Sequence, residues 1–115
     1  MRPRTPFLRN LLVITGSLLF AGACIGPRHT APAPELSPEV FARASTLGFQ
    51  SGQVEHGRAL FEAKCNRCHR LPAVDSESTE EWEEVIPRMA KKAGLDAEEK
   101  AAVRAFVLSA RPTGS

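Results

Sequence analysis

The chain has 115 residues, of which 43% are hydrophobic and 24% are charged, a composition that suits one small globular domain. Its formal net charge is +2, but three arginines lie within the first 23 residues. The remaining sequence keeps 12 of the 15 basic residues against all 13 acidic ones, a formal charge of −1. That balance gives no reason to expect a nucleic-acid partner.

Residues 1–23 have the three parts of a secretory signal peptide. Three arginines form a basic start, Leu11–Phe20 is apolar, and Ala21-Gly22-Ala23 is a small-residue cleavage site. The alternative is an uncleaved membrane anchor, but the apolar run is shorter than the ~20 residues that cross a bilayer as a helix. We therefore expect cleavage and export to the periplasmic side.

Cys24 directly follows this cleavage site. The stretch Leu19–Cys24 resembles the cleavage box of bacterial lipoproteins, with Ala21 where that family prefers Leu. The resemblance implies lipidation of Cys24, and several acyl chains together anchor a protein stably to a membrane. The alternative is plain cleavage, which leaves a soluble protein with an exposed thiol. Residues 24–36 are rich in Pro and Ala and predict an extended tether, in which His29 is expected to be solvated.

A helical domain is expected over residues 37–111, with a short tail at 112–115. Capping residues, prolines and glycines mark the expected helix ends. We find no alternation typical of β-strands, so the predicted fold class is all-α, a small domain of three to four helices. The first helix is expected from Ser37-Pro38 to about Leu47, and the second from about Val54 into the cysteine motif. The third is expected from Glu80 to about Ala93, with a capping box of Ser78 and Glu81, and the fourth after Asp96 to about Ala110.

The string Cys65-Asn66-Arg67-Cys68-His69 is the attachment pattern of c-type haem. On a helical turn, positions three and four residues apart share one face. Cys65 and Cys68 can therefore reach two vinyl groups of one porphyrin, and His69 can bind the iron. The alternatives are a disulfide, a zinc site or a thioredoxin-like pair. A structural zinc site needs four ligands, and the sequence has no second Cys/His cluster; a thioredoxin-like pair needs a βαβ context.

The segment from Gly57 to His69 resembles the N-terminal helix and haem motif of small class I cytochromes c. In that family a glycine eight residues before the first cysteine lets the C-terminal helix cross closely, and an aromatic residue four before that cysteine packs in the crossing. Gly57 and Phe61 hold these positions, and Val103 and Phe106 match their partners in the C-terminal helix. The resemblance covers about residues 53–110 and implies a fold wrapped around one covalent haem c.

Met89 is the expected sixth ligand of the iron. It lies C-terminal to the motif, where the resemblance implies this ligand, and it is the only methionine left once Met1 is removed with the signal. A core methionine that fills a gap is the alternative. The course of the backbone at Met89 stays open, because Met89 follows His69 by only 20 residues and Pro87 could kink or break the helix near Ile86.

Two further residues are expected beside the haem. Trp82 lies seven residues before Met89, on the same face of a helix, and the resemblance implies a hydrogen bond from its indole to a haem propionate. The alternative is a packing tryptophan with a partly exposed N–H. The carbonyl of Pro72 could accept a hydrogen bond from the ring of His69 and fix its tautomer. His56, in contrast, is expected to be solvated rather than a ligand.

These features predict an electron-transfer protein and not an enzyme, because a His/Met pair fills both axial positions of the iron. The expected partners are two redox proteins, an electron donor and an electron acceptor. The protein itself is expected to be a monomer. Basic residues flank the motif and Met89, and we expect them to steer an acidic partner, although ordinary solvated faces would look the same. They are Arg58, Lys64, Arg67 and Arg70 around the motif, and Arg88, Lys91 and Lys92 near Met89. The rival functions are a gas-binding or peroxidase-like haem protein with an open sixth position, and a haem subunit of a larger respiratory complex.

Overall fold

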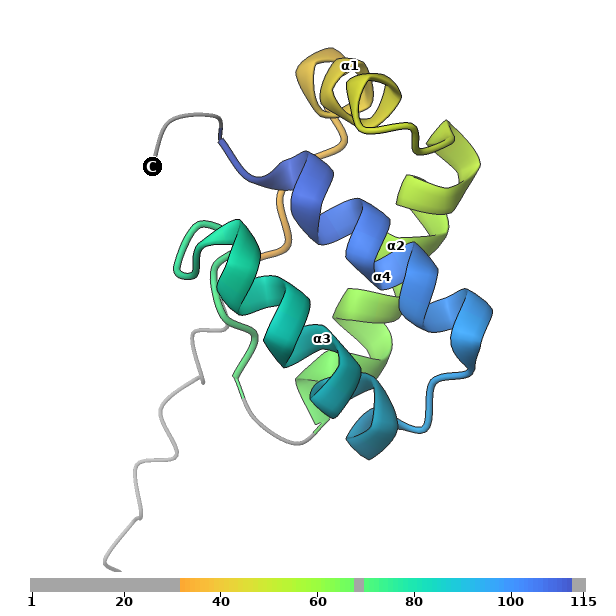
Figure 1. The fold of residues 1–115 in the computed structure, drawn as a ribbon, viewed down its shortest axis with the longest axis vertical. Coiled ribbons are helices and arrows are strands. Elements are labelled where there is room, and N and C mark those ends of the chain that lie inside the picture. The colour runs from red at the N-terminus through yellow and green to blue at the C-terminus, as the bar shows by residue number, and fades with distance from the viewer. Residues whose placement is uncertain (1–31, 68–69, 113–115) are drawn as a thin grey trace, which may run out of the picture.

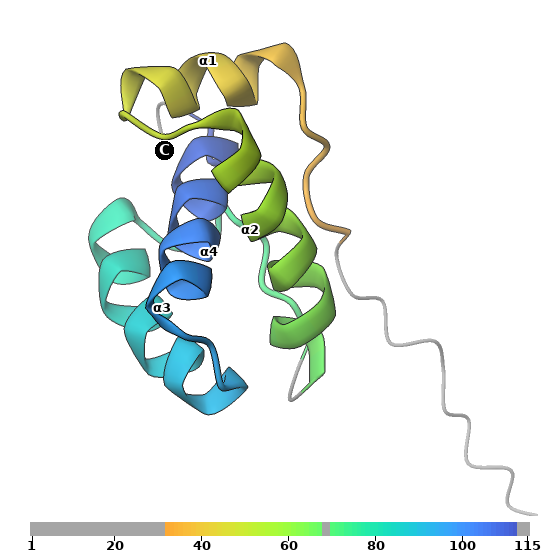
Figure 2. The ribbon, with the colours of Figure 1, turned by 90° about the vertical axis from the view of Figure 1, so that its right-hand side faces the viewer.

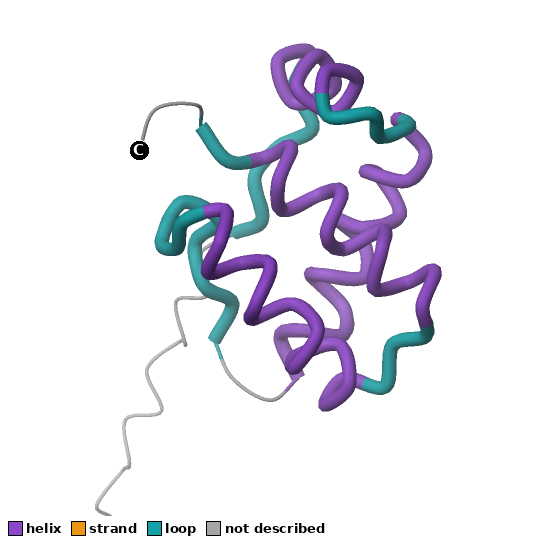
Figure 3. Tube along the Cα trace, in the orientation of Figure 1, coloured by secondary structure: helices purple, strands orange, loops and turns teal. Residues whose placement is uncertain are grey.

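The structure is a computed structural model that describes residues 32–67 and 70–112. The described part contains helices and loops but no strand (Figure 3). The described residues therefore confirm the predicted all-α fold class, and their four helices lie at the top of the predicted range of three to four. The elements in chain order are α1 (Pro38–Thr46), α2 (Ser51–Lys64), the 3-10 turn η1 (Cys65–Arg67), α3 (Thr79–Ala93) and α4 (Ala97–Ala110) (Figure 1).

Three of the four helices have the caps that the sequence predicts. The hydroxyl of Ser78 accepts a hydrogen bond from the N–H of Glu81 at 3.2 Å, and the Glu81 carboxylate accepts one from the N–H of Ser78 at 2.7 Å. Asp96 begins α4 with the same reciprocal box, and Ser37 accepts a hydrogen bond at the start of α1. Gly94 ends α3 with φ of 70°, a left-handed conformation that glycine adopts without strain.

α2 begins earlier than predicted, at Ser51 instead of about Val54. No side chain caps this end; instead, the N–H groups of Gln53 and Val54 donate to the carbonyl of Gln50 at 3.0 and 3.1 Å. Ser51 and Gly52 are weak helix formers, but Val54 is fully buried in the core. The helix therefore begins three residues before the point that local signals indicate, and its first turn leads into the buried Val54.

α2 and α4 form a closely packed helix pair, with α4 between α2 and α3 (Figure 2). A Cβ atom on Gly57 would lie 1.9 Å from the carbonyl oxygen of Ala102 and 2.9 Å from the Cβ of Phe106. Only glycine therefore allows the two helices to approach this closely. The rings of Phe61 and Phe106 pack with their centroids 5.5 Å apart at an angle of 57°. The helix crossing predicted on Gly57, Phe61, Val103 and Phe106 is present.

α1 covers one end of this helix pair (Figures 1 and 2). Its inner residues Val40 and Ala44 are buried in the core. The Nε of Arg43 donates a hydrogen bond to the backbone carbonyl of Ser109, in the last turn of α4, at 2.7 Å. This bond satisfies a carbonyl at the helix end, which has no partner within its own helix.

Residues 33–36, here named the N-terminal strap, pack on the domain before α1 begins. Ala33 is only 4% exposed and belongs to the hydrophobic core. The Nε of Arg58, in α2, donates a hydrogen bond to the carbonyl of Pro34 at 2.9 Å. The packed part of the chain thus includes the end of the segment predicted to be a tether, and the boundary predicted at residue 37 leaves the strap out.

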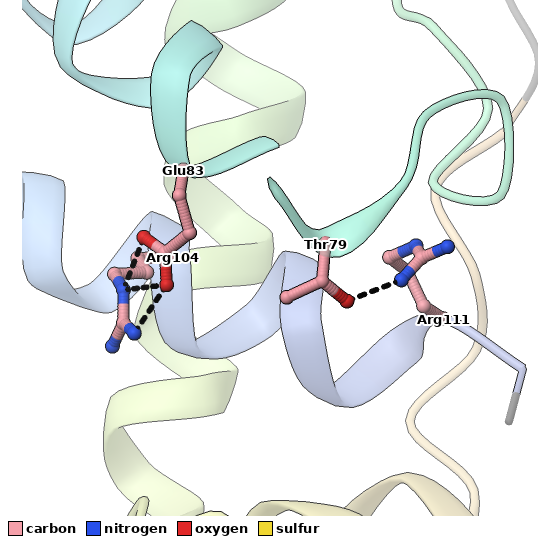
Figure 4. A network of polar contacts seen from close by, with 4 residues as sticks. All are labelled: Thr79, Glu83, Arg104 and Arg111. Atoms are coloured by element: carbon pink, nitrogen blue, oxygen red, sulfur yellow. Dashed lines mark hydrogen bonds and ion pairs between the residues drawn. The ribbon is translucent and has the colours of Figure 1, made fainter. Parts of the chain in front are cut away.

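α3 is held on α4 by two polar contacts (Figure 4). The Nε of Arg104 donates to the two carboxylate oxygens of Glu83 at 2.9 and 2.8 Å. The guanidinium of Arg111 donates to the hydroxyl of Thr79 at 2.6 Å. The hydrogen bond from Arg104 holds the pKa of the Glu83 carboxyl below its usual value. These contacts fix the N-terminal half of α3 on α4, and residues from both halves of α3 line the cavity described next.

Candidate functional site

A cavity of about 320 Å³ lies between the C-terminal end of α2 and one face of α3. α3 packs on α4 and on η1 rather than along α2, so side chains of α2 and α3 border a common space. Phe61 comes to it from α2, Ile86 from α3 and Val103 from α4. The cavity is therefore built by the same helix crossing that forms the core.

Four of the predicted site residues line this cavity, namely Cys65, Pro72, Trp82 and Met89. They come from η1, from the loop that follows it and from α3, and the structure brings them together across 24 residues of sequence. His56 lies exposed on α2, as expected for a solvated side chain.

The other predicted site residues lie outside the described residues. They are Cys68 and His69 of the haem motif, and Cys24 of the predicted lipidation site, together with His29 in the tether. The position of Cys65 is known, because it opens η1 and its half-buried side chain borders the cavity. The part of the motif that the structure describes is therefore at the cavity wall.

The backbone at Met89 is helical, because α3 continues through Pro87 without the break considered near Ile86. A proline inside a helix removes one N–H, so the carbonyl of Glu83 loses its usual partner. Pro87 is exposed, and water can reach this part of the helix. A capping box at one end and Gly94 at the other hold the helix on both sides of the proline. Met89 is half-buried and lines the cavity on the side of α3 that carries Trp82.

Trp82 is a wall of the cavity with its polar atom engaged inside the protein. The side chain is 3% exposed, and its indole N–H donates to the carbonyl of Val74 at 2.9 Å. This hydrogen bond ties α3 to the loop that follows the haem motif. A hydrogen bond from the Trp82 indole to a haem propionate would require the indole N–H to leave the carbonyl of Val74. The alternative prediction, a packing tryptophan with a partly exposed N–H, is wrong about the exposure, because the side chain is buried.

The lining of the cavity is suited to a large apolar cofactor. Apart from Lys64, Lys92 and the thiol of Cys65, every lining side chain is apolar. The volume lies at the lower end of the ~300–1,000 Å³ of small-molecule sites. A thiol on η1 offers a point of covalent attachment, and the thioether of Met89 on α3 offers a soft, neutral ligand for iron. These residues fit a haem c.

An ion pair at the cavity was not predicted from the sequence. Lys64 is one of the residues that line the cavity, and its Nζ lies 2.6 Å from the Oε1 of Glu99 in α4. This hydrogen bond is the main cause that lowers the pKa of the Glu99 carboxyl. The two residues are 35 apart in the sequence, and no spacing rule links them. Lys64 was expected among the basic groups that steer a partner, but Glu99 neutralises its charge.

Arg58 is a second basic residue near the motif that has internal partners. Its guanidinium lies 3.3 Å from a carboxylate oxygen of Glu62 and 3.7 Å from one of Glu35. Arg58 therefore holds the N-terminal strap and offers a docking partner less charge than the sequence indicated.

Function is inferred from the chemistry of the motif and the cavity. Comparison with protein-family models, with curated proteins and with solved structures finds no match for the chain. Within residues 32–67 and 70–112, no three or more His, Cys, Asp or Glu side chains converge in a way that could hold a metal ion. In this same part of the chain, no helix has the length and apolar character to cross a membrane.

Proposed function

We propose that this chain is an exported electron-transfer protein that carries one covalent haem c. The observation that carries the proposal is the convergence of Cys65, the first residue of the CxxCH motif, and Met89 on one apolar cavity. The all-α fold and the close helix crossing at Gly57 support the resemblance to class I cytochromes c.

The roles of the residues follow from their chemistry. Cys65 and Cys68 would hold the porphyrin through thioether bonds, and His69 and Met89 would bind its iron. The bound haem supplies an Fe(III)/Fe(II) couple, whose potential a methionine ligand raises. The apolar walls would limit the access of water to the bound haem. One electron enters from a donor protein and one leaves to an acceptor protein, with no transfer of a proton or an atom to a substrate.

An optical spectrum of the protein, made in a host that attaches c-type haem, tests this proposal. The ferrous wild-type protein should be low-spin and should resist carbon monoxide, because Met89 fills the sixth position. Met89→Ala should give a high-spin or differently ligated haem, a lower potential and ready binding of carbon monoxide. Val85→Ala is the matched control, since Val85 lines the same cavity on α3 but cannot bind iron.

Carbon monoxide also separates the rival function. Ready binding by the wild-type ferrous protein would favour a gas-binding or peroxidase-like protein with an open sixth position. Spectra and potential of Met89→Ala that equal those of the wild-type protein would reject Met89 as a ligand, and another side chain such as Lys91 would then be tested.

We also propose that lipidation of Cys24 holds the domain on the periplasmic side of a membrane. Packing of the chain on the domain is described from Ala33 onward. A fully extended chain spans at most ~3.6 Å per residue, so the nine steps from Cys24 to Ala33 keep the domain within about 32 Å of the anchor. Intact mass spectrometry of the mature protein should show acyl chains on Cys24; an unmodified N-terminal Cys24 would reject lipidation and keep export.

A further inference from the structure

Lys64 is placed to act on a group bound in the cavity. It is the last residue of α2, directly before Cys65, and it is one of two lysines among the residues that line the cavity. About a third of the Lys64 side chain, 32%, is exposed. A charge at the edge of an apolar cavity is screened less than a charge in open water. Lys64 therefore contributes to the electrostatic potential at the site.

Glu99 is held in place before it meets Lys64. Its Oε2 accepts a hydrogen bond from the N–H of Asp96 at 3.1 Å, and its own N–H donates to the Asp96 carboxylate at 2.8 Å. This capping box fixes the carboxylate in the first turn of α4, where the helix dipole favours negative charge. Its second oxygen, Oε1, lies 2.6 Å from the Nζ of Lys64. The position of the lysine ammonium is thus set by a carboxylate that the helix cap orients.

We infer that Glu99 is a positioning residue of the proposed haem site. Glu99 neutralises Lys64 and holds it beside the haem-attachment segment, and the pair thereby sets the local charge on which the reduction potential depends. This inference rests on the proposed function. Reduction adds one electron and lowers the positive charge of the site. A cation at the cavity therefore favours the reduced form, and its paired anion opposes that effect.

Single substitutions at the two residues should shift the reduction potential in opposite directions. Glu99→Gln leaves the Lys64 charge uncompensated and should raise the potential; glutamine can also serve in a capping box, so α4 should keep its cap. Lys64→Gln leaves the Glu99 charge uncompensated and should lower the potential. Lys64→Arg keeps the positive charge, so this variant should have the reduction potential of the wild-type protein. Glu98→Gln is the matched control, because Glu98 lies exposed in the same helical turn.

The measurement is a redox titration of each haem-loaded variant, read from its optical spectrum, with circular dichroism to check helix content. For a one-electron couple, a tenfold change in the reduction equilibrium corresponds to ~59 mV. Shifts of the same sign in Lys64→Gln and Glu99→Gln would overturn the inference, because they would mean that the pair only holds the fold together. Shifts no larger than that of Glu98→Gln would overturn it as well.

Two further results keep the inference separate from the proposed function. If Lys64→Gln fails to mature, Glu99→Gln decides alone, and a lowered potential in that variant overturns the inference. If the wild-type protein carries no haem, both the inference and the proposed function are rejected. A wild-type protein with covalent haem whose variants show no opposed shifts rejects the inference alone.

Discussion

Replacement of Gly57 by alanine should destabilise the domain by forcing α2 and α4 apart. The added Cβ would lie 1.9 Å from the carbonyl oxygen of Ala102, whereas ordinary contacts begin near 3.4 Å, so this part of the interface must open by about 1.5 Å. A gap of ~0.5–1 Å already loses a quarter to a half of the dispersion energy between two surfaces. Overpacking of a core typically costs ~1–3 kcal/mol. The clash involves backbone, so we place the cost at the upper end, at ~3 kcal/mol.

Alanine also has a higher helix propensity than glycine, which returns ~1 kcal/mol. The expected net loss for Gly57→Ala is therefore about 2 kcal/mol, or a fall in Tm of roughly 8–16 °C for a domain of this size. Gly52→Ala is the matched control, because Gly52 is also in α2 but nothing lies within 4 Å of its added Cβ. That variant should be as stable as the wild-type protein or up to ~1 kcal/mol more stable. Denaturant unfolding of both variants is the assay, and a Gly57→Ala variant as stable as Gly52→Ala would refute the reasoning.

Three other contacts give predictions of their own. Arg58→Gln removes the main hydrogen-bond donor to the Pro34 carbonyl, so the N-terminal strap should exchange its amide protons and be cleaved by proteases faster; unchanged protection would contradict the strap's role. The lowered pKa of Glu83 means that its pairing with Arg104 stabilises the fold above the usual carboxyl value of 4.5 and loses this effect as the pH falls through the lower folded-state pKa. Glu83→Gln should therefore flatten the acid side of a stability-against-pH curve, and an equally steep curve would reject this. Trp82→Phe keeps an apolar wall but leaves a buried carbonyl without its donor, which should cost ~1–3 kcal/mol in unfolding measurements with little effect on the haem spectrum; a clear change in potential would instead support the propionate role.

The local elements of this fold could be predicted because their signals are local. Ser78, Gly94 and Asp96 mark helix ends by side-chain or backbone chemistry that acts within one turn, and all three lie where the helices begin or end. Gly57 could be placed at a helix crossing because its spacing from Cys65 matches a family pattern. Met89 could be placed near the motif on the same grounds, and the cavity contains both Cys65 and Met89.

The contacts that could not be predicted join residues far apart in the sequence. Ala33 lies in a Pro- and Ala-rich segment whose composition is typical of a tether, and its inclusion in the domain depends on the fit of its side chain into the core and on the hydrogen bond from Arg58 to the carbonyl of Pro34. Lys64 and Glu99 meet because α2 and α4 cross at a particular angle, which no single helix encodes. The partner of the Trp82 indole is a backbone carbonyl, and every residue type offers one.

The most direct test of the central claim is the mass of the denatured protein after production with c-type haem maturation. If Cys65 and Cys68 hold the porphyrin covalently, acid extraction should leave the haem on the polypeptide, and the mass should equal that of the mature chain with its modifications plus one haem. Changing either cysteine to Ala should leave a singly linked or weakly held haem. Release of free haem from the intact wild-type chain, or a mature chain without haem, would contradict the account.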